Sequence, residues 1–348
     1  MSYPPPIGWF ELVGLGAFSL SFVLSIVIFS LLLRRPNRLL ALDAPSGRGL
    51  HQRSTPRGGG IVITLVVGLT ALLLTTWGGS GWSSVGLGLA LSGISVIGFV
   101  DDHRSLTVRF RLLSGFGLMA VVLAFSIEQS TWLVFGSNMN WPLAIVFLPA
   151  LLLMVWFVNL FNFMDGADGL AALQALIAAF VLACWFAISG QLGLSVLNFS
   201  LAGAVSAFVY YNWAPAKIFL GDAGSLGLGA WFACMGVIGA TTAGFPLEAF
   251  FVLLGYFWFD ATLTLVCRLF SGKKLSEPHR EHLYQRLILS GRSHRWVALL
   301  TGGINLLLAS IACCIVYYPQ YSLMFALGAF LLLSFFSGWI LRSSSDSY

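Results

Sequence analysis

The sequence predicts an all-α polytopic membrane protein. Of its 348 residues, 58% are hydrophobic and only 9% are charged, whereas a soluble domain contains about 25% charged residues. The mean hydropathy is +0.89, and the apolar residues form about eleven runs near the length of about 20 residues that a helical span requires. Short alternating segments typical of a membrane β-barrel are absent from the sequence.

The spans are predicted from these apolar runs. Their approximate ranges are 7–33, 60–77, 84–100, 110–128, 143–161, 167–188, 194–213, 225–243, 247–270, 296–316 and 322–341. The first run is too long for a signal-peptide core and follows no basic segment, so it is expected to remain as a span. No long linker or low-complexity segment interrupts the series, and we expect one membrane domain over residues 1–348.

The basic residues predict the orientation of the spans. All 18 Lys and Arg lie in alternate connections or in the tail: six within 34–57, three within 104–111, Lys217, seven within 268–295, and Arg342. The connections around 78–83, 129–142, 189–193, 244–246 and 317–321 contain none. By the positive-inside rule the basic side is cytoplasmic, which places the N-terminus in the periplasm and the C-terminus in the cytoplasm. The net charge of +5 is therefore a topology signal and does not indicate nucleic-acid binding.

The segment between the fifth and sixth predicted spans is unusually polar. It reads Asn159-Leu-Phe-Asn162-Phe-Met-Asp165-Gly-Ala-Asp168-Gly-Leu. Ionisable groups at a membrane boundary are costly, so they indicate a functional site. A helix turns about 300° in three residues, so Asn159, Asn162 and Asp165 would share a face, and the glycines could let both carboxylates converge. A polar turn between two membrane helices is the alternative.

Further carboxylates lie in or beside the cytoplasmic connections. Asp101 and Asp102 directly follow the third predicted span, where their mutual repulsion suits a divalent metal or a general base. Asp222 lies between glycines at the start of the eighth span, where it could hold a metal or cap the helix. Asp260 lies inside the ninth predicted span, too far from Arg268 for a direct pair, and its role stays open.

Two basic connections complete the polar segments. The first contains Thr55 and Arg57, followed by three glycines whose backbone amides could approach a phosphate closely. The last contains His279, Arg280 and His282, and the two histidines are expected on one helical face. Matching zinc ligands are missing, so the cations indicate an anion site. Attraction of this connection to anionic lipid is the alternative.

These groups together suit phosphoryl transfer on a membrane lipid. Mg²⁺ prefers a few carboxylates together with substrate phosphate oxygens, and phosphoryl transfer depends on in-line positioning and charge neutralisation. The sequence has neither a Walker A motif nor a Rossmann glycine fingerprint, so a nucleotide donor is expected to be held by loops.

The same motifs resemble those of the polyprenyl-phosphate N-acetylhexosamine-1-phosphate transferases, the superfamily that includes the phospho-N-acetylmuramoyl-pentapeptide transferases. The resemblance runs from His51 to about Arg286. It is carried by Thr55-Pro-Arg-Gly-Gly-Gly-Ile, Asp101-Asp102, Asn159-x-x-Asn162-x-x-Asp165-Gly-x-Asp168-Gly-Leu, Gly221-Asp222-x-Gly-Ser225-Leu and His279-Arg-x-His282-Leu-Tyr-Gln-Arg286.

The resemblance implies transfer of a sugar-1-phosphate from a UDP-sugar to undecaprenyl phosphate in the bacterial cytoplasmic membrane, with release of UMP. Mg²⁺ is the implied cofactor, with Mn²⁺ as an alternative ion, and a homodimer is an expected assembly. Asp101 and Asp102 would activate the lipid phosphate, and Asp222 and Asp165 would bind the metal. The implied nucleotide- and substrate-binding residues are Asn159, Asn162, Asp168, Thr55, Arg57, Lys217, His279, Arg280 and His282. Which aspartate of the adjacent pair is the base, and whether a covalent intermediate forms, both stay open.

The chain departs from the family pattern in two places. After the aspartate pair it has His103-Arg104-Ser105, where the family often has an acidic residue, an amide or a lysine. Its last basic connection lacks the triple histidine of the peptidoglycan branch and is closer to the form found in O-antigen and related enzymes. This favours a UDP-N-acetylhexosamine donor, including a 6-deoxy sugar, for a surface polysaccharide, with muramoyl-pentapeptide transfer as the alternative. A secondary transporter is the alternative from another class, although its charged sites would be expected near the membrane midplane.

Overall fold

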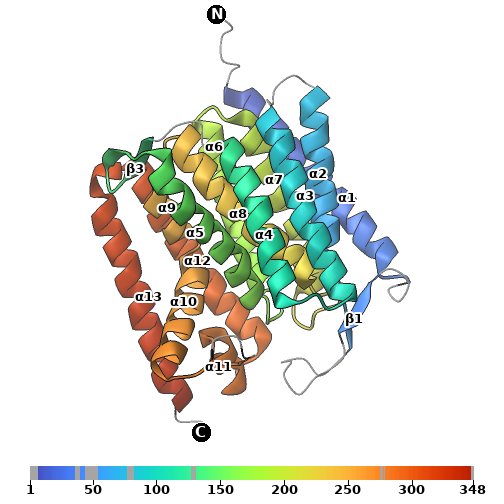
Figure 1. The fold of residues 1–348 in the computed structure, drawn as a ribbon. Helices are drawn as coiled ribbons and strands as arrows, with labels where there is room; N and C mark the ends of the chain where they lie inside the picture. The colour runs from blue at the N-terminus through green and yellow to red at the C-terminus, as the bar shows by residue number, and fades with distance from the viewer. Residues whose placement is uncertain are drawn as a thin grey trace, which may run out of the picture.

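The structure, a computed structural model, describes residues 7–35, 40–43, 54–76, 82–126, 131–274, 277 and 279–345. Long helices run side by side through the molecule (Figure 1). The helices are α1 (Ile7–Leu32), α2 (Gly59–Thr76), α3 (Trp82–His103), α4 (Val108–Ser126), α5 (Leu143–Phe163), α6 (Leu170–Ile188), α7 (Leu192–Asn212), α8 (Gly221–Thr242), α9 (Leu247–Leu253), α10 (Gly255–Phe270), α11 (Leu283–Leu289), α12 (His294–Tyr317) and α13 (Ser322–Ser345). Two antiparallel hairpins pair β1 (Ala41–Asp43) with β2 (Thr55–Arg57) and β3 (Thr131–Val134) with β4 (Ser137–Asn140).

The predicted all-α membrane class is confirmed. In the part of the chain that the structure describes, seven helices are long and apolar enough to cross a bilayer, and α9 with α10 would make an eighth span. Each predicted range coincides with a helix or with this pair. The number of spans and their sidedness stay predictions. α1 begins and α13 ends at opposite ends of the bundle (Figure 1), as an odd number of crossings requires.

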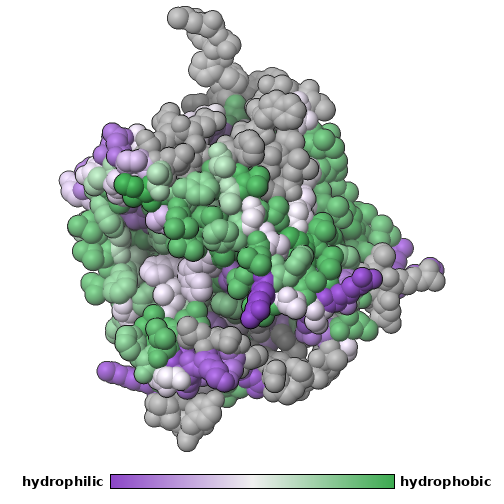
Figure 2. Space-filling model, in the orientation of Figure 1, coloured by the Kyte–Doolittle hydropathy of each residue, from purple (hydrophilic) through white to green (hydrophobic). Residues whose placement is uncertain are grey.

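The outer surface suits a lipid environment. Figure 2 shows mainly hydrophobic residues across the middle of the visible face, with most of the strongly hydrophilic residues toward the lower end, where α11 and β1 lie. Leu113, Phe335 and Phe270 are 73%, 77% and 87% exposed. Because water would make so much exposed apolar surface unfavourable, these side chains are expected to face lipid tails.

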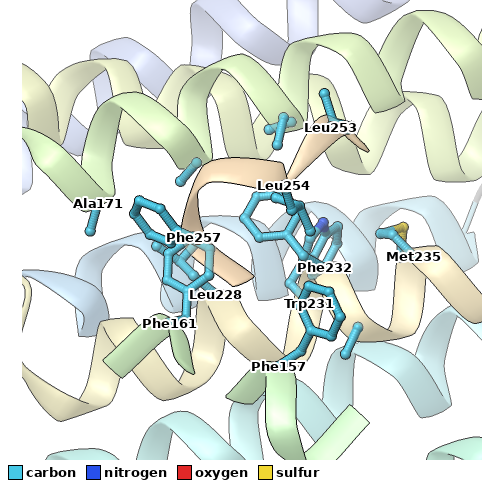
Figure 3. Close-up of a cluster of buried hydrophobic side chains, with 14 of the residues drawn as sticks. Phe157, Phe161, Ala171, Leu228, Trp231, Phe232, Met235, Leu253, Leu254 and Phe257 are labelled. Atoms are coloured by element: carbon cyan, nitrogen blue, oxygen red, sulfur yellow. The ribbon is translucent and has the colours of Figure 1, made fainter. Parts of the chain in front are cut away.

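α8 is the central helix, and 94% of its most apolar 18-residue stretch is buried within the protein. Its Phe232 stacks on Phe161 of α5 with ring centres 5.5 Å apart, and Phe161 also contacts Phe257 of α10 at 4.9 Å. Figure 3 shows these aromatic rings within one apolar cluster. The cluster therefore fixes α8 relative to the two helices that carry Asn162 and Asp260.

The span predicted over 247–270 is not one continuous helix. α9 and α10 are two helices that meet at an angle of 80°. Leu254, between them, has φ −100° and ψ 18°, outside the helical range, and the following Gly255 is a poor helix former. The apolar run continues through the break, so hydrophobicity alone gave no sign of it. After the bend, α10 runs in a different direction from α9. Asp260 lies on α10 and contacts the start of α11.

Candidate active site

The ends of α2, α3 and α8 meet at one end of the bundle. A Cβ added to Gly60 would collide with the Cα of Gly224, and one added to Gly98 would collide with the carbonyl oxygen of Asp222. The glycines therefore permit a helix contact too close for any side chain. This contact brings the predicted catalytic and metal-binding aspartates together.

Strand β2 is held beside the start of α8 by backbone hydrogen bonds. The N–H of Phe219 donates to the carbonyl oxygen of Pro56 at 2.8 Å, and the N–H of Gly59 donates to the carbonyl oxygen of Phe219 at 2.9 Å. As a result, Nη1 of Arg57 lies 3.6 Å from Oδ1 of Asp102. The first basic connection thus reaches the aspartate pair, while Nη2 of Arg57 also pairs with Oδ1 of Asp43 at 2.6 Å.

Asp101 and Asp102 are adjacent in sequence but have different partners. Asp102 accepts the N–H groups of Asp222 at 3.0 Å and Ala223 at 3.2 Å, and its side chain is 0% exposed. It therefore satisfies backbone donors at the start of α8 that have no partner within the helix. Asp101 lies 2.7 Å from Nη1 of Arg111 and accepts the N–H of Leu106 at 2.6 Å.

Asp222 receives two donors from other helices. Asn162 Nδ2 donates to Asp222 Oδ1 at 2.7 Å and also to Ser225 Oγ at 2.9 Å. Arg111 Nη1 lies 3.5 Å from Asp222 Oδ2. Asn162 and Asp222 are therefore brought together as predicted.

Arg111 is a site residue that the sequence analysis missed. It bridges Asp101 and Asp222, and its side chain is 32% exposed. Arg111 follows Asp101 by only ten residues, but the cations of that connection were interpreted only as indicators of the cytoplasmic side. A guanidinium between two carboxylates offsets their repulsion and can also bind a phosphate.

Asp165 and Asp168 have different surroundings. Burial raises the pKa of the Asp165 carboxyl well above its usual value, and the negative charges of Asp222 and Asp102 add to this effect. Asp168 is 6% exposed and accepts the N–H of Ala216 at 3.1 Å. Asp165 thus lies within electrostatic reach of the other aspartates, while Asp168 Oδ2 supports the connection that precedes α8.

The two histidines of the last basic connection precede a helix. They were expected to share a helical face, which is wrong, because α11 begins only at Leu283. The His279 and His282 rings nevertheless lie close, with centres 5.0 Å apart. His282 is 3% exposed, and its Nδ1 lies 3.3 Å from Oδ1 of Asp260. Burial, with the neighbouring His282, lowers the pKa of His279 to about 4.

The remaining predicted substrate-binding residues lie on β2, on α5 and in the connections before α8 and α11. Thr55 is 7% exposed in β2, and Lys217 Nζ lies 5.7 Å from the centre of the Tyr210 ring. Asn159 Nδ2 donates to the carbonyl oxygen of Val155 at 2.7 Å. Arg280 lies directly after His279. His51, where the family resemblance begins, lies outside the described residues.

The donor set fits a magnesium ion that also binds substrate. Among the described residues, no group of three or more His, Cys, Asp or Glu side chains could hold an ion by itself. Mg²⁺ needs only one or two carboxylates when substrate phosphates supply further oxygens. Asp222, which lies among the like charges described above, provides such a carboxylate, and Asp165 is the predicted second ligand.

A cavity of about 50 Å³ adjoins the charged groups. Arg111, Asn159 and Asn162 form its polar side, while Ile97, Val158 and Leu226 are among its apolar lining residues. A second cavity, of about 180 Å³, has an almost wholly apolar lining from α5, α8, α9 and β3. The smaller cavity therefore has a polar side beside the charged groups and an apolar side formed by the helices.

Comparisons with known proteins agree with this chemistry. The model of glycosyl transferase family 4 matches residues 84–240. The chain is 27% identical over 288 residues to a probable undecaprenyl-phosphate N-acetylglucosaminyl 1-phosphate transferase of Bacillus subtilis, covering 81% of this chain and 79% of that protein. It is 31% identical over 302 residues to the decaprenyl-phosphate N-acetylglucosaminephosphotransferase of Mycobacterium leprae, covering 76% and 74%. It is also 29% identical over 319 residues to a phospho-N-acetylmuramoyl-pentapeptide-transferase of a Geobacillus species, covering 85% and 95%.

Proposed function

Because this chain belongs to glycosyl transferase family 4, among the polyprenyl-phosphate N-acetylhexosamine-1-phosphate transferases, we propose that it transfers a sugar-1-phosphate from a UDP-sugar to undecaprenyl phosphate. An oxygen of the lipid phosphate attacks the phosphorus that carries the sugar. The bond from that phosphorus to the oxygen of UMP breaks. The products are undecaprenyl-diphospho-sugar and UMP.

The observation that carries the proposal is the meeting of charged groups from separate segments around Asp222. Arg57 and Arg111 supply positive charge, and Asn162 orients the Asp222 carboxylate. Bound Mg²⁺ would supply the remaining charge neutralisation for the diphosphate, held by Asp222 and Asp165. Such positioning and neutralisation are the main requirements of phosphoryl transfer.

The partners of the aspartate pair support Asp101 as the group that deprotonates the lipid phosphate. Asp102 already accepts two backbone N–H groups and lies near Arg57. Asp101 faces Arg111, which also lines the smaller cavity, and we propose that the lipid phosphate binds at this cavity. His279, Arg280, Lys217, Thr55, Asn159 and Asp168 are proposed to bind the donor or its nucleotide.

For the donor, we propose a UDP-N-acetylhexosamine that initiates O-antigen or another surface polysaccharide. The last basic connection supports this choice, since it has His279-Arg-Glu-His282 in place of a triple histidine. Transfer of phospho-muramoyl-pentapeptide is the second candidate, because relatives with that name cover up to 85% of this chain. In both cases we propose one domain in the bacterial cytoplasmic membrane, with its site facing the cytoplasm.

The test uses the purified protein with undecaprenyl phosphate, Mg²⁺ and a panel of UDP-sugars that includes the muramoyl-pentapeptide donor. Release of UMP and formation of labelled lipid are followed for each sugar. We expect turnover that chelation abolishes and that Asp222→Ala eliminates while membrane insertion is retained. Absence of metal-dependent UMP release with every donor would refute the proposal and reopen the transporter alternative.

A further inference from the structure

Asp260 is a buried carboxylate on α10 that none of the proposed chemical steps uses. Its side chain is 0% exposed, and a buried charge is costly unless donors surround it. Its Oδ1 accepts the N–H of Leu283 at 2.9 Å, the hydroxyl of Thr264 at 3.2 Å, and lies 3.3 Å from Nδ1 of His282. The N–H of Tyr284 reaches Oδ2 at 3.5 Å. Three of these four groups belong to the start of α11, so Asp260 mainly anchors α11.

Arg268 holds the preceding part of the same connection. It lies about two turns further along α10, and its side chain is 4% exposed. Its Nη1 lies 2.7 Å from Oε1 of Glu281, and its Nη2 donates to the carbonyl oxygen of Lys274 at 2.7 Å. α10 therefore fixes the last basic connection at both sides of its predicted substrate-binding residues.

α11 is in turn attached to the end of α5, next to Asn162. The hydroxyl of Tyr284 donates to the carbonyl oxygen of Phe163, the last residue of α5, at 3.0 Å. The Tyr284 ring also stacks on the His282 ring, with centres 5.9 Å apart and planes 14° apart. Phe163 directly follows Asn162, which binds Asp222. A continuous set of contacts thus links Asp260 to the proposed metal site.

We propose that Asp260 is a positioning residue for the donor diphosphate. It fixes His282 and the start of α11, and through them it holds His279 and Arg280 in a connection that Tyr284 attaches to the end of α5. The inference rests on the proposed transferase function. Because a displacement of about 1 Å can change a rate roughly 100-fold, loss of this anchor is expected to weaken donor binding without affecting lipid binding.

The test is Asp260→Asn, with Glu248→Gln as a matched control. Glu248 is also a buried acid of the bent helix pair, 6% exposed, but it accepts the N–H of Phe135 in the hairpin β3–β4. For Asp260→Asn we expect KM for the UDP-sugar to rise about tenfold or more, while KM for undecaprenyl phosphate changes less than about twofold. For Glu248→Gln we expect both constants within about twofold of wild type.

Double variants separate positioning from a general loss of structure. If Asp260 acts through His279, the double variant should have nearly the same donor KM as His279→Gln alone. If the two residues act independently, the increases in donor KM from the two single variants should multiply. Where Asp260→Asn fails to fold, Tyr284→Phe tests the same set of contacts by removing the bond to Phe163, and the donor KM should again rise.

Two results would overturn the inference. One is an unchanged donor KM in these variants, and the other is full multiplication of the effects of Asp260→Asn and His279→Gln. Failure of the proposed function looks different, since wild-type protein would then release no UMP.

Discussion

Asp102 and Asp101 are expected to differ in role, since Asp102 supports the fold and Asp101 takes part in the chemistry. In Asp102→Asn one amide oxygen can still accept the N–H of Asp222 or Ala223, but the amide nitrogen cannot accept the other. Leaving a buried donor unsatisfied costs about 1–3 kcal/mol. For a chain of this length, that loss corresponds to a fall in the apparent unfolding temperature of roughly 1–4 °C.

The assay is thermal unfolding of the detergent-solubilised variants at one scan rate, combined with UMP release per folded protein. Asp101→Asn is the control, because the amide oxygen at this position can still accept the N–H of Leu106, and Arg111 keeps Asp222 within 3.5 Å. We expect Asp101→Asn to unfold close to wild type and to lose at least about 100-fold in kcat, the contribution of a general base. An Asp102→Asn variant that is inactive but as stable as wild type would refute this division of roles.

Three further predictions follow from the same geometry. Asp165→Asn should inactivate the enzyme yet raise the free energy of unfolding at pH 7.5 without Mg²⁺ by on the order of 1 kcal/mol. The reason is that burial and the nearby aspartates raise the pKa of Asp165 and make its ionised form unfavourable in the folded state. Thermal unfolding measures this, and the gain should vanish well below pH 3.8, where the carboxyl is protonated in both the folded and the unfolded state. The free energy of unfolding should fall as the pH drops from 6.5 toward 4. Burial and His282 lower the pKa of His279 to about 4, so in this range the unfolded state binds more protons than the folded state. In His279→Gln the unfolding temperature should depend less on pH over that range. Gly98→Ala should destabilise the fold by about 1–3 kcal/mol or more, because its Cβ meets the backbone of Asp222.

Each of these three predictions has a distinct contrary result. A less stable Asp165→Asn variant would mean that its ionised form is compensated in the folded protein. A pH profile unchanged by His279→Gln would assign the acid sensitivity to other groups. For Gly98→Ala the control is Gly117→Ala, since a Cβ on Gly117 meets nothing within 4 Å, and equal unfolding temperatures for the two variants would contradict the packing argument.

Much of the candidate site could be predicted because its polar residues cost free energy at a membrane boundary. Carboxylates and amides beside apolar runs are retained only for a reason, so Asp101, Asp222 and Asn162 were identified before the structure. The structure brings these three residues together through Arg111 and the Asn162 amide. Arg111 itself was missed, because a cation at a cytoplasmic helix end is expected whether or not it has a chemical role.

Asp260 shows what pattern reasoning cannot reach. Its sequence neighbours are apolar, and every group that binds it except Thr264 lies more than 20 residues away along the chain. The sharp bend before Gly255 is invisible in the hydropathy, and the contact between α10 and the start of α11 is seen only in the structure.

The sequence by itself therefore determined the membrane class and the polar residues that form the candidate site, because burying apolar runs and exposing charges are local demands of each segment. The tertiary structure decided which aspartate accepts the backbone of α8, which faces Arg111, and what Asp260 anchors. Those assignments depend on helices meeting at angles and distances that are set by small residues and aromatic packing across the bundle, and a one-dimensional pattern does not contain them.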